Sequence, residues 1–164
     1  MQIYLPRFGS VIAGQGGVLA AIMRGPIVNG EEQDPYALLD TGIEFESEWG
    51  KYGKLIDGAT SRVDGKANTD AMLRAGCTAA TRLAEMESEG HKDLFIAAIG
   101  QMNAAAANVP ERFDPKGVQW TSTQASRNFA FVQDFATGLS YWYGKGNEFR
   151  VRAFRSIPLH LLNP

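Results

Sequence analysis

Two short segments in the last quarter of the chain carry side chains suited to binding another molecule. They run from Gln124 to Asn128 and from Tyr141 to Asn147. Amide, hydroxyl, guanidinium and aromatic groups come together in them, and this mixture gives recognition loops contact area at little loss of side-chain entropy. We therefore predict a ligand-binding surface made of Gln124, Ser126, Arg127, Asn128, Tyr141, Tyr143, Lys145 and Asn147.

A structural role for the aromatic residues is an equally open interpretation. Trp120 and Trp142 are large enough to fill a core, and Tyr141 and Tyr143 could cover the edge of a sheet. The sequence leaves both interpretations open.

Motifs for catalysis and for metal binding are missing from the sequence. His91 and His160 have no second histidine or cysteine at the spacing of a metal site, so we predict no metal. The stretch from Gly14 to Gly17 lacks the lysine and the following helix of a phosphate-binding loop, and no nucleophile elbow or EF-hand pattern occurs. We expect a protein that is not an enzyme and that needs no cofactor.

Composition indicates one turn-rich globular domain over residues 1–164, with 45% hydrophobic residues to form a core and 18 glycines. The formal net charge of −2 gives no general attraction to phosphate backbones, so nucleic acid is not an expected partner. Cys77 is the single cysteine and cannot form an intramolecular disulfide.

The apolar segment from Val11 to Met23 is interrupted by glycines and is too short to cross a bilayer. We interpret it as strands rather than as a signal peptide or an anchor. The expectation is synthesis in the cytoplasm without a signal peptide, and no insertion into a membrane.

Strands are predicted near the start of the chain, over Met1–Pro6 and Val18–Met23. The region 27–66 contains one strand candidate, Tyr36–Leu39, and is otherwise predicted to be loop because Gly, Asp, Glu and Asn dominate it without a sustained period.

Two helices are predicted in the middle of the chain. The first begins near Asn68, is interrupted at Gly76 and ends at Gly90, and its apolar residues recur at helical spacing. The second covers Ile99–Ala107, where four consecutive alanines favour a helix, and Pro110 limits its extent.

Four strands are predicted after residue 117, over Val118–Thr123, Phe129–Phe135, Tyr141–Tyr143 and Phe149–Ala153. The connections between them are too short for a crossover helix, so we expect one antiparallel meander.

The order of several short motifs resembles the C-type-lectin-like domain family, of the type found at the C-terminus of collagen-like adhesins and in phage tail and virion proteins. The motifs are Gly16-Gly17, Glu48-Trp49-Gly50, Asp64-Gly65-Lys66-Ala67-Asn68-Thr69, Gly76-Cys77, Gly90, Trp120-Thr121-Ser122-Thr123-Gln124 and Phe149-Arg150-Val151-Arg152-Ala153-Phe154-Arg155. Two departures are Leu94-Phe95-Ile96-Ala97-Ala98, where the family has W-[FY]-L-P-S, and Met86, where it often has a cysteine.

The resemblance implies an α+β fold: two helices packed on a small antiparallel sheet, with a C-terminal β-meander and long loops. Residues 1–13 would include a docking strand, with apolar Ile3, Tyr4, Leu5 and Phe8, and residues 156–164 would form a tail. Arg150, Arg152 and Arg155 would be scaffold residues that pair with acids such as Asp134 and Glu148. Formylglycine-generating enzymes share this fold but need a cysteine pair, and calcium-binding lectins need E-P-N and W-N-D motifs; neither feature occurs here.

The function that the resemblance implies is a phage virion protein at the tail tip, tail fibre or baseplate that presents a lectin-like surface to a host cell-surface receptor, either a glycan or a protein. The alternative is a structural virion component, such as a capsid decoration or tail accessory protein, that uses the same surface to bind other virion proteins. Either function is compatible with a homo-oligomer such as a trimer.

Overall fold

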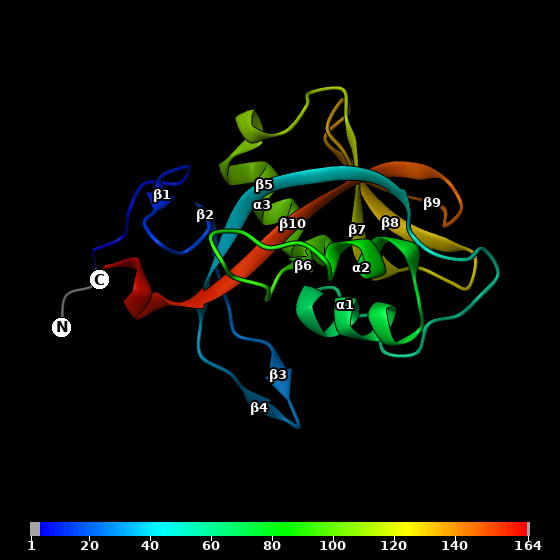
Figure 1. Cartoon of the computed structure of the whole chain (residues 1–164), viewed down its shortest axis with the longest axis horizontal. Coiled ribbons are helices and arrows are strands. Elements are labelled where there is room, and N and C mark those ends of the chain that lie inside the picture. The colour runs from blue at the N-terminus through cyan, green and yellow to red at the C-terminus, as the bar shows by residue number, and fades with distance from the viewer. Residues whose placement is uncertain (1–3, 164) are drawn as a thin grey trace.

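The computed structural model describes residues 4–163, and one large mixed sheet dominates it (Figure 1). The strands are β1 (Val11–Ile12), β2 (Gly17–Met23), β3 (Ile27–Val28), β4 (Glu31–Glu32), β5 (Tyr36–Glu48), β6 (Phe95–Ile96), β7 (Val118–Gln124), β8 (Phe129–Asp134), β9 (Leu139–Gly144) and β10 (Glu148–Pro158). The helices are α1 (Gly65–Arg74), α2 (Thr78–Leu83) and α3 (Ile99–Asn108), with short 3-10 turns η1 (Pro110–Arg112) and η2 (Leu159–Leu162).

Strand β10 lies in the middle of this sheet, whose order is β1-β2-β5-β10-β7-β8-β9. On one side β10 pairs antiparallel with β5, from Glu148 opposite Glu48 to Pro158 opposite Tyr36. On its other side it pairs with β7 in parallel and with β6 antiparallel. The long β5 and β10 ribbons therefore join the β1–β2 half of the sheet to the β7–β9 half (Figure 1).

The expected α+β, C-type-lectin-like fold is wrong. The structure is mostly one large mixed sheet with three short helices within residues 4–163, rather than two helices on a small antiparallel sheet. Only β7, β8 and β9 form an antiparallel meander, because β10 leaves it and lies between β5 and β7. The prediction of loop over 27–66 is also wrong, since this region contains the hairpin β3–β4 and the 13 residues of β5.

The helix predictions agree better with the structure, except that the first predicted helix ends at Leu83 of α2 and not at Gly90. The predicted interruption at Gly76 is confirmed, since this residue has φ +74° and separates α1 from α2. The predicted helix Ile99–Ala107 corresponds to α3. The start of α1 differs, because Asp64 is the N-cap residue and accepts a hydrogen bond from Ala67 N at 3.0 Å, whereas Asn68 lies buried inside the helix.

Helices cover both faces of the sheet. Val151 and Ala153 of β10 belong to a core cluster with α1 and α2, whereas Phe154 belongs to a second cluster with α3. Successive residues of a strand point to opposite faces, so α1 and α2 lie on one face and α3 lies on the other.

A buried ionic network lies where β5, β10 and η1 meet. The Asp40 carboxylate is fully buried, accepts a hydrogen bond from Arg112 Nε at 2.6 Å and lies 3.6 Å from Arg152 Nη1. Arg152 also pairs with Glu44 at 2.8 Å and lies with its guanidinium over the Phe113 ring. Asp40 and Glu44 of β5 are thus neutralised by arginines from η1 and β10.

The predicted pairing of the three C-terminal arginines with acids is confirmed, but the acids differ from those expected. Arg150 pairs with Asp114 at 2.8 Å, Arg152 pairs with Glu44 and Arg155 pairs with Asp93 at 2.7 Å. Neither Asp134 nor Glu148 takes part in these ion pairs within residues 4–163.

The first and last described residues lie side by side, since Asn163 Nδ2 donates a hydrogen bond to Tyr4 O at 2.7 Å (Figure 1). Residues 4–10 form no strand, so the predicted strand Met1–Pro6 is absent where it can be assessed, and Met1–Ile3 lie outside the described residues. Tyr4, Leu5 and Phe8 are exposed, as a docking segment requires. The predicted tail is instead the end of β10 followed by η2, with Pro164 outside the described residues.

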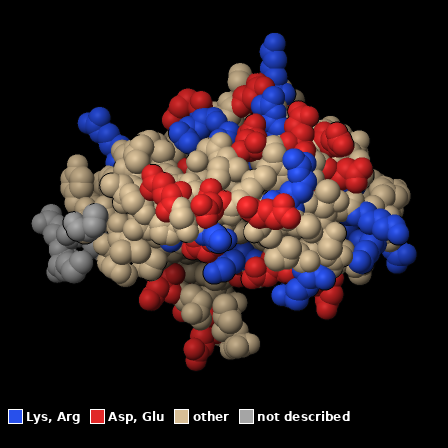
Figure 2. Space-filling model, viewed as in Figure 1, with Lys and Arg blue, Asp and Glu red and all other residues tan. Residues whose placement is uncertain are grey.

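Acidic and basic side chains are interspersed over the face seen in Figure 2, and no large area of one sign occurs on it. The hairpin β3–β4 projects from the body of the molecule in both views (Figures 1 and 2). Its apolar Ile27 and Val28 are exposed.

Candidate functional site

The structure brings the eight residues predicted to bind a ligand to one end of the sheet, but divides them into two groups. Gln124 and Lys145 are buried and cannot contact a ligand. Arg127, Tyr141, Tyr143 and Asn147 are exposed, and Ser126 and Asn128 are partly exposed. The prediction is therefore wrong for the first group, whereas the role of the second group remains a prediction.

Lys145 and Gln124 form a buried polar cluster. The Lys145 ammonium donates hydrogen bonds to Lys54 O at 2.8 Å and to Gln124 Oε1 at 2.9 Å, and it lies 4.7 Å from the centre of the Trp49 ring. Gln124 Oε1 also accepts from Ile56 N at 3.0 Å, and Gln124 Nε2 donates to Ile56 O. These bonds fix the loop around residues 49–56 against the sheet, so the cluster is structural.

Burial lowers the pKa of Lys145 from the usual 10.5 to about 8. The unfolded chain therefore binds more protons than the folded protein between these two values, and this residue makes the free energy of unfolding rise as pH increases through that window. We expect the stability difference between wild type and Lys145→Met to grow in favour of wild type by about 1–3 kcal/mol from pH 7.5 to pH 10.5. Urea unfolding at several pH values measures this difference, and parallel stability curves would contradict it.

Exposed aromatic and polar side chains surround strand β9, and we call them the β9 surface. Its members are Tyr52, Arg127, Tyr141, Trp142, Tyr143 and Asn147. The two turns beside β9 are rigid, because Lys145 N donates to Asn128 O at 2.9 Å and Asn147 Nδ2 donates to Gly144 O at 2.9 Å. Ser126 Oγ accepts hydrogen bonds from the backbone of Asn128 and Phe129, both at 3.1 Å. The backbone that carries the exposed groups is therefore fixed by hydrogen bonds.

Two members of the β9 surface were not among the predicted site residues. Trp142 is 59% exposed, so the alternative of a core position does not apply to it, whereas Trp120 is fully buried. Tyr52 lies edge-to-face against Phe129, with ring centres 6.5 Å apart, and is 58% exposed. Alternation in 139–144 could have indicated an edge strand, but no local pattern links Tyr52 to it.

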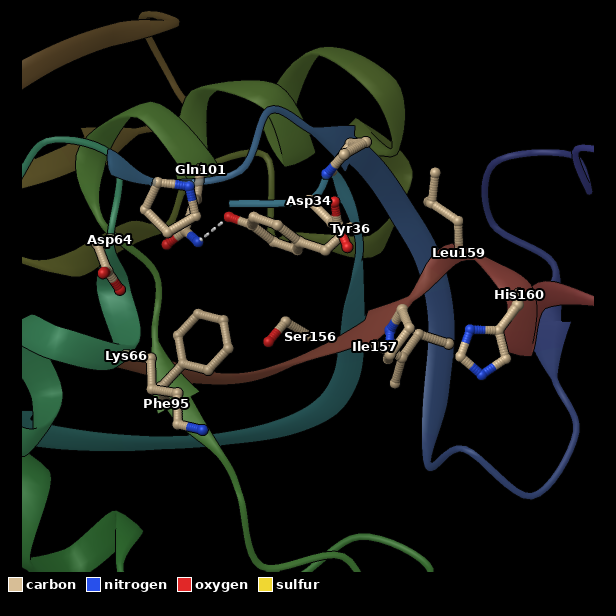
Figure 3. Close-up of a pocket in the computed structure, with 13 residues that line it drawn as sticks. Asp34, Tyr36, Asp64, Lys66, Phe95, Gln101, Ser156, Ile157, Leu159 and His160 are labelled. Atoms are coloured by element: carbon tan, nitrogen blue, oxygen red, sulfur yellow. Dashed lines mark hydrogen bonds between the residues drawn. The ribbon is translucent and has the colours of Figure 1, made fainter. Parts of the chain in front are cut away.

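A cavity of about 610 Å³ lies at the other end of β5 and β10 (Figure 3). Phe95, Ile157 and the ring of Tyr36 form apolar walls, and Asp34, Asp64, Lys66, Ser156 and His160 supply polar groups. Such a combination suits a ligand with an apolar body and a few polar groups.

Gln101 organises this cavity from α3. Its Oε1 accepts hydrogen bonds from Gly65 N at 3.1 Å and from Ala98 N at 2.9 Å, and its Nε2 donates to the Tyr36 hydroxyl at 2.6 Å (Figure 3). Burial raises the pKa of Tyr36, so the hydroxyl stays protonated at neutral pH. Sequence reasoning missed the cavity because its lining comes from separate segments between Pro26 and His160.

No group of three or more His, Cys, Asp or Glu in residues 4–163 is arranged to hold a metal ion. His91 Nε2 lies 2.8 Å from Gly14 O, and His160 lines the cavity. Cys77 is buried at the start of α2, where burial raises the pKa of its thiol. The helices of this part of the chain are all too short to span a bilayer.

The fold of this chain, but not its sequence, is similar to that of a known protein. No protein-family model and no curated protein matches the sequence. The structure is similar to the crystal structure of a fimbrial protein from Bacteroides ovatus, with a TM-score of 0.53 and 10% sequence identity over 88% of this chain and 44% of that protein. The chain thus spans less than half the length of the fimbrial protein. This likeness concerns the fold, and it leaves the resemblance to C-type-lectin-like motifs a prediction.

Proposed function

We propose that this chain is a structural, adhesin-like protein displayed on the surface of a cell or of a virus particle. The observation that carries the proposal is the β9 surface, where Tyr141 and Tyr143 are exposed on one face of the strand and Trp142 on the other, beside turns held by hydrogen bonds. Exposed aromatic groups rimmed by amide and guanidinium groups are typical of surfaces that bind other macromolecules. The fold similarity to a fimbrial protein supports a role of this kind.

Within this role, we propose a phage virion protein of the tail tip, tail fibre or baseplate that binds a host receptor. The motif resemblance to domains of phage tail and virion proteins supports this assignment. The receptor, a glycan or a protein, would contact Tyr143, Arg127 and Asn147, which lie at the turn end of β9.

Binding to whole cells tests the proposal. Fluorescently labelled purified protein is incubated with a panel of bacterial strains and, separately, with a glycan array. We expect saturable binding to some strains. The double variant Arg127→Ala with Asn147→Ala should bind at least about tenfold more weakly, because a few central contacts supply most of the binding energy.

The matched control is Lys66→Ala with His160→Ala, which changes two exposed residues at the cavity. This control should bind like wild type. Loss of binding in the control alone would show that the receptor binds at the cavity and not at the β9 surface. Absence of binding to every strain and glycan would refute the receptor role.

The second candidate function is assembly into a particle, as a capsid decoration or tail accessory protein. The outer edge of β9 favours it, because an unpaired strand can pair with a strand of another protein. In this case the purified chain would bind assembled particles and would not bind cells.

A further inference from the structure

The cavity between the base of the hairpin β3–β4, the start of α1 and the end of β10 has the size of a ligand site. Its volume of about 610 Å³ lies within the range of about 300–1,000 Å³ that is usual for sites that bind small molecules. Apolar groups, among them Phe95, Ile157 and the ring of Tyr36, make up most of its wall (Figure 3). The cavity can therefore take up the apolar body of a small molecule.

The Tyr36 hydroxyl supplies this cavity with a hydrogen-bond donor that is still free. Gln101 Oε1 accepts hydrogen bonds from Gly65 N and Ala98 N, and these two bonds fix which way the amide group faces. Gln101 Nε2 therefore donates to the Tyr36 hydroxyl oxygen, at 2.6 Å, and the proton of that hydroxyl makes no hydrogen bond within residues 4–163. Because Gln101 is only 2% exposed, the donor is held in place from inside the protein.

The Asp64 carboxylate supplies an acceptor at the same end of the cavity. Asp64 directly precedes Gly65, which binds Gln101, and it lies with Tyr36 at the Gln101 end of the cavity (Figure 3). Burial and the negative charge of Asp64 both raise the pKa of Tyr36, so the hydroxyl keeps its proton at neutral pH. Asp64 Oδ1 accepts from Ala67 N, whereas Oδ2 has no hydrogen-bond partner in the described part of the chain.

A hydroxyl group is the small group that suits this donor and this acceptor together. An ammonium group could donate to Asp64 but could not accept from Tyr36, and a carboxylate could accept from Tyr36 but would be repelled by Asp64. One hydroxyl oxygen accepts and donates at the same time. The many hydroxyls of a sugar would also lie against Phe95 and Ile157, where they would lose their hydrogen bonds to water.

We propose that this cavity binds an uncharged apolar ring molecule with a single hydroxyl group, of the class of phenols and alicyclic alcohols. The ring packs against Phe95 and Ile157, and the hydroxyl accepts from Tyr36 and donates to Asp64. Gln101 is a positioning residue, because it holds the Tyr36 hydroxyl in place. The site lies at the other end of β5 and β10 from the β9 surface, so the inference goes beyond the proposed function and does not depend on it.

Three ligands of almost the same shape test the inference: 2-naphthol, 2-methoxynaphthalene, which can accept but not donate, and naphthalene, which can do neither. Isothermal titration calorimetry with the full chain at pH 7 measures their affinities. We expect a dissociation constant of about 100 μM or lower for 2-naphthol and at least about tenfold weaker binding of the other two, since a hydrogen bond to a charged group is lost. In ¹H–¹⁵N NMR spectra, the amide signals of Gly65 and Ala98 should shift when 2-naphthol binds, because both bind Gln101.

Two variants assign the contacts to named side chains. Tyr36→Phe keeps the ring and removes the hydroxyl, so it should bind 2-naphthol at least about tenfold more weakly than wild type. Asp64→Ser removes the carboxylate and keeps an oxygen that can cap α1, and it should have the same effect. The matched control Asp57→Ser changes an exposed aspartate that does not line the cavity, and it should bind like wild type. Thermal unfolding verifies that each variant is folded.

Absence of saturable 2-naphthol binding to wild type would overturn the inference, and so would equal affinities for the three ligands. Unchanged binding by both cavity variants would contradict the assigned contacts. Tighter binding of methyl glucoside than of 2-naphthol would show that the site takes sugars and not the class proposed. None of these results bears on the proposed function, because the cell assay tests Arg127 and Asn147 at the β9 surface.

Discussion

Replacement of Asp40 by alanine is expected to lower the free energy of unfolding by about 3–5 kcal/mol. Asp40 is fully buried, and its carboxylate accepts hydrogen bonds from Arg112 Nε at 2.6 Å and from Gly42 N at 3.0 Å. Without it, Arg152 keeps only one of its two acidic neighbours in a nearly buried position. A buried guanidinium that loses a counter-charge is costly because it cannot recover full hydration.

Urea unfolding monitored by circular dichroism measures this effect, and Glu32→Ala is the matched control. Glu32 pairs with Arg24 at 2.6 Å, but both side chains are more than half exposed, so its loss should leave the stability almost unchanged. Asp40→Asn separates charge from hydrogen bonding, and it should fall between wild type and Asp40→Ala. Equal stability of Asp40→Ala and Glu32→Ala would show that the network does not hold β5 to β10.

Replacement of Trp120 by alanine is expected to lower the free energy of unfolding by about 3–5 kcal/mol. Trp120 is fully buried in β7, its Nε1 donates to Ser47 O at 3.0 Å, and its ring lies edge-to-face with Phe149 at 5.0 Å between centres. Trp49 makes the reciprocal bond, from its Nε1 to Thr121 O at 2.8 Å. The two indoles thus join β7 to the end of β5, and truncation of one leaves a cavity and an unpaired carbonyl.

Trp142→Ala is the control for this prediction, because it removes the same side chain from the exposed edge of the sheet. It should lower stability by no more than about 1.5 kcal/mol, because the exposed ring keeps only one edge-to-face contact, with Phe131. Thermal and urea unfolding followed by circular dichroism avoid the loss of tryptophan fluorescence in either variant. Similar stability losses in both variants would mean that Trp142 is also buried in solution.

The sequence predicted the helices better than the sheet, and the reason lies in the range of the interactions. Gly76 and the alanines before Asn108 act on neighbouring residues, so the interruption after α1 and the position of α3 follow from local rules. Strand β5 instead carries Asp40, Glu44 and Glu46, which look solvated in isolation. Arginines far away in sequence pair with the first two, so only the fold explains them.

The position of β10 was unpredictable for a similar reason. Its alternation correctly indicated a strand, but the short turn before it suggested pairing with β9. The strand instead fills the gap between β5 and β7, where Val151 and Phe154 are buried on opposite faces. In this position β10 buries apolar side chains on both of its faces, which is more favourable than lying next to the exposed strand β9 as the fourth strand of a meander.

The candidate site was predicted in part. Tyr141, Tyr143, Arg127 and Asn147 are exposed on one end of the sheet, as recognition residues must be. Lys145 stands in a Gly-Lys-Gly-Asn turn, a context typical of an exposed lysine, yet the loop around Trp49 covers it completely. Turn composition describes the backbone, whereas burial depends on which distant loop packs over the turn.

The central place of β10 also sets the order in which the protein can form during synthesis. Within residues 4–163, β10 follows every other strand, and it alone connects β5 to β7. During synthesis the strands on the two sides of β10 therefore have no shared edge until β10 itself emerges. The chain completes its core in a step that depends on contacts between distant segments, the kind of step that slows folding and keeps strand edges unpaired for longer.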